Sequence, residues 1–246
     1  MAMRFKKGQF GANKLAACLI ALAITAGCAS TTVSNRQQVA TGYLPRPNQV
    51  WVYDFAATPA DVPPESSLAG QTSADTAPQT ADQIAEGRKL AAQITANLVQ
   101  QITAMGLSAA TGSPATRPQL NDLVIEGSIL SVQQGSAAER VAIGFSAGQS
   151  EMKVAVEGFQ MTPTGLRKLG SGDVGATGNK TPGSAVGLAV LIATHNPAGL
   201  IVSTGMKVYG EKSGSSTVEG RAKQISQEIA DALKKRFQEQ GWISAS

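Results

Sequence analysis

The feature that most constrains the fold is an apolar residue repeated every seven positions between residues 80 and 106. The residues of the repeat are Ile84, Ala91, Leu98 and Met105. Ile94 and Ile102 lie beside them on the same stripe. Thr80 and Gln83 have the spacing of a capping box at the start of a helix, and Gly106 is typical of a helix end. A helix with one apolar stripe has to bury that stripe. The pattern therefore predicts a long amphipathic helix packed on another layer of the domain.

Strand-like segments lie on both sides of this helix in the sequence. Residues 49–55, QVWVYDF, alternate in the manner of a strand with both faces largely covered. Because the later strands are joined by short turns, they should pair antiparallel, whereas the first strand and the long helix can form a parallel βα crossover. The stretches between these elements, 56–80 and 107–121, are expected to be loops. The later strands are predicted at residues 122–132, 139–145, 151–161 and 166–174.

A second amphipathic helix is expected near the C-terminus. Ser216 and Glu219 have the spacing of a capping box, and Gly241 is placed to end the helix. Trp242 and Ile243 should then cover the edge of the core. One face of the helix carries Val218, Ala222, Ile225, Ile229, Leu233 and Phe237. Residues 49–243 are therefore predicted to form one α+β domain, with a mixed, mainly antiparallel sheet packed by two long helices.

An uncharged segment, residues 181–206, lies between the last predicted strand and the second helix. Gly183 and Gly187 have the GxxxG spacing of closely packed helices, but Pro197 interrupts the run. We therefore expect a Gly/Ala-rich helical hairpin over residues 183–208 rather than one spanning helix. The hairpin is expected either to be buried in its own domain or to contact a membrane or another copy of the chain, and the sequence leaves both alternatives open.

The first 27 residues have the organisation of a secretion signal. Four basic residues precede an uncharged apolar run, Leu15–Ala26. The run fits the ~7–15 residues of a signal peptide and is shorter than the ~20 residues that span a membrane. Residues 1–27 are therefore predicted to be removed. A plain secretory signal and an uncleaved anchor helix are the alternatives for the lipoprotein signal described next.

Residues 25–28, TAGC, resemble the lipobox of bacterial lipoproteins. The resemblance implies cleavage before Cys28 and attachment of lipid to that residue. Several acyl chains hold a protein firmly, because each buried methylene contributes ~0.8 kcal/mol. In lipoproteins of this type, a residue other than Asp after the cysteine, here Ala29, implies sorting to the outer membrane. Residues 28–48 are then expected to form a flexible tether between lipid and domain.

The net charge of +4 belongs to the signal segment. Without its four basic residues the chain has 17 Lys and Arg against 17 Asp and Glu, which is no electrostatic footprint for nucleic acid. Cys18 leaves with the signal and Cys28 would carry lipid, so no thiol remains for a disulfide or a cysteine metal site. His195 is the single histidine and provides no ligand cluster. We therefore expect no metal, no cofactor and no nucleic-acid partner.

One motif suggests catalysis. Residues 144–148, GFSAG, match GxSxG, and Asp173 and His195 follow in the order of the α/β-hydrolases. A nucleophilic Ser146 would need a tight turn from a strand into a helix. Residues 151–161 are strand-like instead, so the motif is interpreted as a turn between strands.

Other motifs are weaker. Residues 170–175 match GxGxxG, but no helix is predicted after them to receive a pyrophosphate, and a flexible loop is expected there. Four glutamates lie in predicted strands, and their expected place is an exposed strand face rather than a pair that transfers protons: Glu126, Glu139, Glu151 and Glu157.

Several short segments, taken in order, resemble a family of bacterial lipoproteins, the domain of unknown function 4410. The likeness spans most of residues 46–243. It implies a secreted lipoprotein without an assigned activity, and therefore no catalytic residue. The segments are Arg46-Pro47, residues 122–127 (DLVIEG), Arg140 with residues 143–148 (IGFSAG), Gly220-Arg221 and residues 240–242 (QGW).

The leading hypothesis is a non-enzymatic outer-membrane lipoprotein that faces the periplasm. It would bind the membrane through its N-terminal lipid and act as a structural or assembly partner of other envelope proteins. The alternative is an oligomeric export or pore component that self-associates through residues 183–208. A serine hydrolase that uses Ser146 is the least supported hypothesis.

Overall fold

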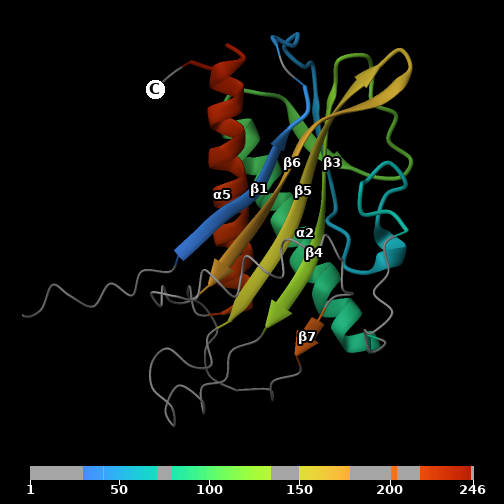
Figure 1. The fold of residues 1–246 in the computed structure, drawn as a ribbon, viewed down its shortest axis with the longest axis vertical. Coiled ribbons are helices and arrows are strands. Elements are labelled where there is room, and N and C mark those ends of the chain that lie inside the picture. The colour runs from blue at the N-terminus through green and yellow to red at the C-terminus, as the bar shows by residue number, and fades with distance from the viewer. Residues whose placement is uncertain are drawn as a thin grey trace, which may run out of the picture.

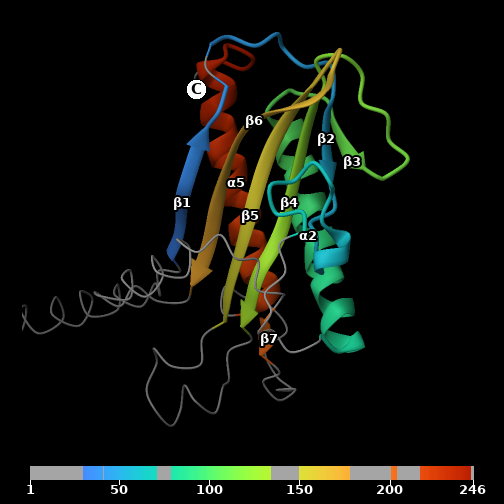
Figure 2. The same cartoon turned by 45° about the vertical axis from the view of Figure 1, so that its right-hand side comes forward.

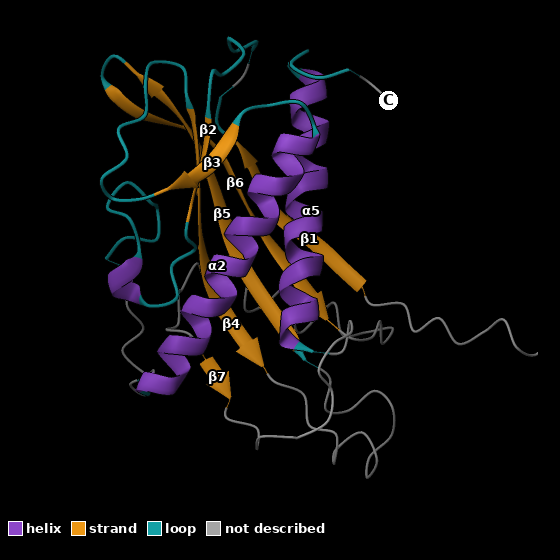
Figure 3. Cartoon of the chain, turned by 180° about the vertical axis from the view of Figure 1, so that it is seen from behind, coloured by secondary structure: helices purple, strands orange, loops and turns teal. Residues whose placement is uncertain are grey.

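The computed structural model of the chain describes residues 30–40, 42–70, 79–133, 150–177, 201–203 and 217–244. A sheet of seven strands is covered on one face by two long helices, as Figures 1 and 3 show from opposite sides. Within these residues, no helix combines the length and the apolar character that crossing a membrane requires. The strands are β1 (Ser30–Gln38), β2 (Val50–Tyr53), β3 (Ala109–Gly112), β4 (Leu123–Gln133), β5 (Glu151–Thr162), β6 (Gly165–Thr177) and β7 (Ile201–Ser203).

The sheet is mixed, and most of its pairing is antiparallel, as predicted. Six strands follow the order β1-β6-β5-β4-β2-β3, and β7 pairs with β4. The long ladders β1–β6, β6–β5 and β5–β4 are antiparallel, and a tight turn between Thr162 and Gly165 joins β5 to β6. β2 is parallel to both β3 and β4, which confirms the predicted βα crossover.

The first helix, α2 (Ala81–Ala104), follows the prediction at both ends. The Thr80 hydroxyl accepts from the backbone N–H of Gln83, and the Gln83 side chain accepts from the N–H of Thr80. Gly106 takes a φ of 86° just beyond the helix, where a residue with a side chain would be strained. The apolar stripe is buried as expected, with Leu90, Ile94, Leu98 and Ile102 all fully enclosed.

The N-cap of the second helix, α5 (Val218–Glu239), lies one residue later than predicted. Thr217, not Ser216, is the N-cap, and its hydroxyl accepts from the backbone N–H of Gly220 at 3.0 Å. Gly241 has a φ of 70° at the other end, and Trp242 is buried, as predicted. Lys89 of α2 lies 3.4 Å from Glu219 of α5, so the two helices start at the same end of the molecule.

The core lies between the helices and one face of the sheet. Val52 of β2 and Met152 of β5 meet Ile94 and Ile225 from the two helices. The other face carries the alternate residues of the same strands and is covered in part by the loop after β2, which contains a 3-10 turn, η1 (Pro59–Asp61) (Figure 2).

Four predictions of secondary structure are corrected. Residues 30–38, expected to belong to a flexible tether over residues 28–48, form β1 at the edge of the sheet. Their sequence, STTVSNRQQ, has only one apolar residue, so no alternating pattern announces the strand. Its place depends on backbone pairing with β6, which lies far away in the chain.

Residues 109–112, predicted to be loop, form β3 because β2 offers them a parallel partner. Residues 170–175, predicted to be a loop, lie inside β6. Residues 201–203, predicted to be helical, form β7 and pair with β4. The remainder of the predicted hairpin 183–208 and the predicted strand 139–145 lie outside the described residues.

Candidate functional site

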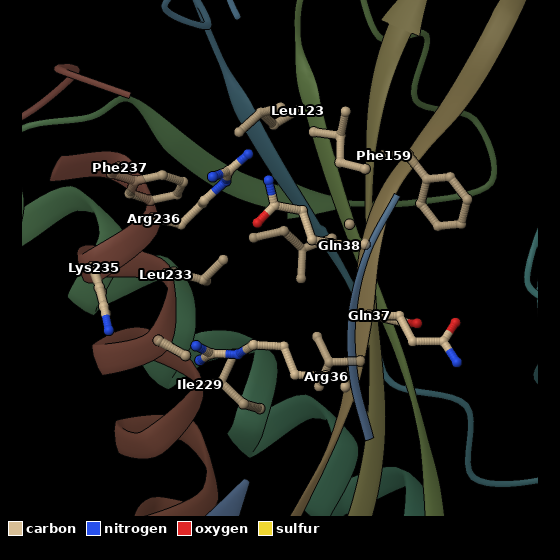
Figure 4. A pocket seen from close by; sticks show the side chains of 18 of the residues that line it. Arg36, Gln37, Gln38, Leu123, Phe159, Ile229, Leu233, Lys235, Arg236 and Phe237 are labelled. Carbon is tan, nitrogen blue, oxygen red and sulfur yellow. The ribbon is translucent and has the colours of Figure 1, made fainter. Parts of the chain in front are cut away.

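A cavity of about 260 Å³ lies between the second half of α5 and the sheet face formed by β1, β6 and β5 (Figure 4). Its walls are largely aliphatic. They include Val33 of β1, Leu169 of β6 and Val156 of β5 on the sheet side, and Ile229 and Leu233 on the helix side.

Small residues in the strands leave this space open. The pairing of β5 with β6 shifts register after Gly158, where Leu169 of β6 is the extra residue, and a Cβ built on Gly158 would meet no atom within 4 Å. Gly158 pairs with Ile125, a core residue, so the missing side chain would point towards the helices. In β6, Gly170 and Gly172 also line the cavity. The helix therefore packs on a sheet that lacks side chains at the centre of the contact.

Cationic side chains lie at the rim of the cavity. In Figure 4, the Arg36 side chain extends from β1 towards α5, Gln38 points into the same space, and Gln37 points away. Lys235 and Arg236 contribute from α5. Arg236 is satisfied by Glu239 at 3.1 Å, whereas no described residue pairs with Arg36 or Lys235. Two cations that have no partner within the described ranges thus accompany an apolar wall.

The segment 42–44 closes one end of the cavity. Gln240 and Trp242, which follow α5 in the chain, hold this segment in place. The Gln240 amide accepts from the N–H of Leu44 at 2.6 Å and donates to the carbonyl of Gly42 at 3.0 Å. The Trp242 indole donates to the Leu44 carbonyl at 3.1 Å, and its ring lies 5.5 Å from that of Phe237. These contacts give the sequence segment 240–242 (QGW) a structural role.

The opposite face of the sheet holds a pair of buried glutamates. Glu126 of β4 and Glu157 of β5 are register partners, only 2% and 3% exposed. This corrects the prediction that the strand glutamates lie on exposed faces. Glu139 is outside the described residues, and Glu151 lies half-buried at the end of β5, 3.3 Å from Lys153. Cross-strand register, which a single sequence does not specify, brings the pair together.

The two carboxyl groups have opposite environments. Burial alone would raise the pKa of Glu157, but hydrogen bonds from Lys168, Ser66 and Ser67 outweigh it and hold that pKa below its ordinary value. Among the described residues, no group makes a hydrogen bond of ordinary geometry to either carboxyl oxygen of Glu126. Burial first, then the Glu65 side chain through hydrogen bonding and through its charge, and then the charge of Glu157 raise the pKa of Glu126 to about 8. At neutral pH, Glu126 is therefore a neutral acid beside an ionised Glu157.

Acid–base enzymes also push the pKa values of two carboxyl groups apart. Here, however, Lys168 and the serines of the loop after β2 occupy the Glu157 carboxylate, in the manner of a structural ion pair. Tyr53, whose pKa is raised by burial and then by Glu126, lies beside the pair on β2. The arrangement can hold a proton on Glu126 and fasten the loop to the sheet.

Most site residues proposed from the sequence lie outside the described part of the chain: Cys28, Ser146 and His195. Asp173 lies in β6, where its carboxylate accepts from the Asn35 amide of β1 at 2.9 Å. β5 begins at Glu151, so the GFSAG motif leads into a strand and not into the helix that a nucleophilic serine requires. In the described residues, no group of three His, Cys, Asp or Glu side chains could hold a metal ion.

The remaining segments of the family resemblance have structural contacts. Arg46 donates to the Gly106 carbonyl at the end of α2 at 2.9 Å. Asp122 accepts from the Trp51 indole at 3.1 Å. Arg221 is buried, and its Nε donates to the Ser150 carbonyl at 3.0 Å, while burial lowers its pKa.

Two solved structures are similar to the chain at low identity. The PelC dodecamer from Paraburkholderia phytofirmans is 13% identical with a TM-score of 0.35, and the alignment covers 70% of this chain and 99% of that one. The hypothetical protein CT253 from Chlamydia trachomatis is 9% identical with a TM-score of 0.38, and the alignment covers 76% and 96%. TM-scores this low support no conclusion about this chain. No curated protein matches it.

The family comparison is more informative. Residues 50–194, more than half of the chain, match the family described as Domain of unknown function (DUF4410). The match runs from β2 through β6, and so includes the parallel crossover, the buried glutamates and the β5 and β6 residues that line the cavity, but neither β1 nor α5. The predicted resemblance is confirmed over residues 50–194, whereas its segments at 46–47, 220–221 and 240–242 lie outside the match. The chain belongs to the domain of unknown function 4410 family.

Proposed function

We propose that this chain is a non-enzymatic lipoprotein of the bacterial outer membrane, with its domain in the periplasm. It would act there as a structural or assembly partner of other envelope proteins. The observation that carries the proposal is the short distance in sequence between Cys28 and the fold. β1 begins at Ser30, and two residues span at most about 7 Å. A lipid on Cys28 would therefore hold the edge of the sheet at the membrane surface.

This attachment supports one orientation of the domain. Ser30 pairs with Thr177, Thr177 with Glu151, and Glu151 with Gln133, so four strand ends lie at the end of the sheet nearest Cys28. That end would face the lipid. The segment 42–44 and Trp242 lie at the other end of β1 and would point into the periplasm, where an envelope partner could reach them (Figure 1).

Fractionation of a lipidating bacterium tests the anchor. The wild-type protein should be in the outer-membrane fraction, and Cys28→Ala should release it into the soluble periplasm. Cys18→Ala is the matched control, because this cysteine lies inside the predicted signal and should leave the distribution unchanged. Retention of Cys28→Ala in the membrane, or an unmodified Cys28 in the mass spectrum of the mature protein, would contradict the proposal.

The alternative, self-association through residues 183–208, is less well supported. β7 is the described part of this segment, and it pairs with β4 of the same chain over Ser131–Gln133. This pairing favours burial of the segment in its own domain. Cross-linking of the membrane-extracted protein tests the alternative: a ladder of higher oligomers would favour a pore component, and a monomer would exclude it.

Catalysis by Ser146 can be tested directly. A fluorophosphonate probe should label the wild-type protein no more than it labels the Ser146→Ala variant. Labelling that depends on Ser146 would overturn the non-enzymatic assignment.

A further inference from the structure

The cavity between α5 and the sheet has the features of a ligand site. Its volume of about 260 Å³ is close to the lower end of the ~300–1,000 Å³ that ligand pockets occupy. A structural cavity of this size would cost stability through lost contacts. The space is set by Gly158 and by the bulge beside it, and closure at one end by Gln240 and Trp242 keeps it from collapsing.

The chemistry of the walls selects the ligand. A peptide would bury N–H and C=O groups that need partners, and aliphatic walls such as Val156, Leu169 and Leu233 offer none. A hydrocarbon chain needs only contact and exclusion of water. The rim adds Arg36 and Lys235, neither of which pairs with a described residue, and Arg36 reaches across the opening towards α5 (Figure 4). A guanidinium and an ammonium group at the mouth favour an anionic head group.

We propose that this cavity binds a single-chain fatty acid, with the acyl chain between Ile229 and Val156 and the carboxylate at Arg36 and Lys235. The inference goes beyond the proposed envelope role and does not depend on a lipid at Cys28. A free acyl chain held here would be a separate ligand of the folded domain.

Binding can be measured on the full chain carrying Cys28→Ala, which needs no detergent that would compete for the cavity. The chain has two tryptophans, and only Trp242 lines the cavity, whereas Trp51 bonds to Asp122 on the other face. In a Trp51→Phe background, Trp242 fluorescence therefore reports occupancy. Laurate, dodecanol, dodecyl phosphate and dodecyltrimethylammonium share one chain length and separate the contribution of the head group. Laurate is expected to bind about tenfold more tightly than dodecanol, and the cationic amphiphile more weakly than either.

Two kinds of variant test the location. Gly158→Val from the sheet and Leu233→Trp from the helix should each fill the cavity and weaken laurate binding at least about tenfold. Arg36→Gln and Lys235→Gln should remove the advantage of laurate over dodecanol and leave dodecanol binding unchanged. Lys234→Gln is the matched control, because Lys234 is the neighbour of Lys235 on α5 but does not line the cavity.

The outcomes are separable. Thermal unfolding of each variant confirms that it is folded. Absence of saturable laurate binding, or full binding in both folded cavity-filling variants, would overturn the site. Equal affinity for all four head groups would overturn the anionic ligand, and preference for dodecyl phosphate over laurate would replace the fatty acid by a phosphate amphiphile. A failed anchor would appear only in the Cys28→Ala fractionation.

Discussion

At the scale of single residues, Glu126 is the most unusual group in the described structure. A carboxylic acid lies within β4, is 2% exposed, and has only the Glu65 carboxyl group, at poor hydrogen-bond geometry, as a partner among the described residues. Its neighbour Glu157 shows the alternative, since Lys168 and two serines stabilise its charge. The two register partners therefore respond to pH in opposite directions.

The first prediction concerns this pH dependence. The pKa of Glu126 is about 8 in the folded chain and near 4.5 in the unfolded chain, so between these pH values the folded state keeps a proton that the unfolded state releases. The contribution of Glu126 to the free energy of unfolding should therefore be fully present below about pH 4.5. It should be lost as the pH rises to about 8, by up to about 1.4 kcal/mol per pH unit. Glu126→Gln should remove this decline and stabilise the protein near pH 8, as urea unfolding at several pH values can measure.

Glu157→Gln is the contrasting variant. The lowered pKa of Glu157 means that its contribution to stability is present above its unfolded pKa of about 4.5 and is lost as pH falls through the lower, folded value. Its replacement should destabilise the protein by roughly 2 kcal/mol at neutral pH, because Lys168 loses its partner. Equal pH profiles for both variants and the wild type would contradict the assignment of the two protonation states.

A second prediction concerns two glycines of the sheet. A Cβ on Gly127 of β4 would overlap the ring of Phe55, which is buried in the core, so Gly127→Ala should destabilise the protein by roughly 1–3 kcal/mol. Gly158 of β5 is the matched control, because its Cβ would enter open space. Thermal unfolding should show an unchanged or slightly higher midpoint for Gly158→Ala. Equal losses for the two variants would mean that the aromatic contact does not decide the cost.

At the scale of elements, β1 shows that residues 30–38 are part of the folded sheet and not of a tether. A tether could be removed without consequence, whereas β1 pairs with β6 through seven registered residue pairs and contributes Val33 and Arg36 to the cavity. Its loss would expose the edge of β6 and one side of the cavity. An unpaired edge strand is also a site for aggregation.

The third prediction follows from this pairing. A mature chain that begins at Val39 should unfold at a lower urea concentration than one that begins at Cys28, and with a smaller denaturant dependence because less surface is buried. It should also aggregate more readily through the β6 edge. An unchanged midpoint would mean that β1 contributes nothing to the stability of the domain and acts as the tether first predicted.

At the scale of the whole molecule, the strand directions place the start of β1 at one end of the sheet and the segment 42–44 at the other. Both α2 and α5 start at the end where β1 starts (Figure 3). The cavity opens beside β1, away from that end, because its rim residues Arg36 and Gln38 lie in the second half of the strand. If Cys28 carries the proposed lipid, a ligand or partner could therefore reach the cavity while that lipid stays in the membrane.

The fourth prediction tests this orientation. Both natural cysteines are removed or modified in the lipidated protein, so an introduced cysteine can be labelled alone. A fluorophore on Thr32→Cys, near the start of β1, should be quenched by lipids that carry a quencher at the bilayer surface. A fluorophore on Tyr43→Cys, where the native side chain is 86% exposed, should not be quenched. Equal quenching at the two positions would exclude the proposed orientation.

The sequence by itself determined the elements whose pattern is local. The seven-residue repeat and the cap at Thr80 specified α2, and runs with alternating or β-branched residues specified β2, β4 and β5. A helix or strand with a buried face records its period in its own residues, whereas β6 was predicted only in part. The short segments within residues 50–194 also indicated the family correctly. Membrane attachment at Cys28 remains a prediction.

The tertiary structure alone decided the rest. β1, β3 and β7 are short or polar, so they become strands only where a distant strand supplies hydrogen bonds. Register placed Glu126 opposite Glu157, and the cavity beneath α5 lies beside Gly158, where the pairing of β5 with β6 shifts register. These features are contacts between segments tens of residues apart, and neither partner carries the information about such a contact in its own sequence.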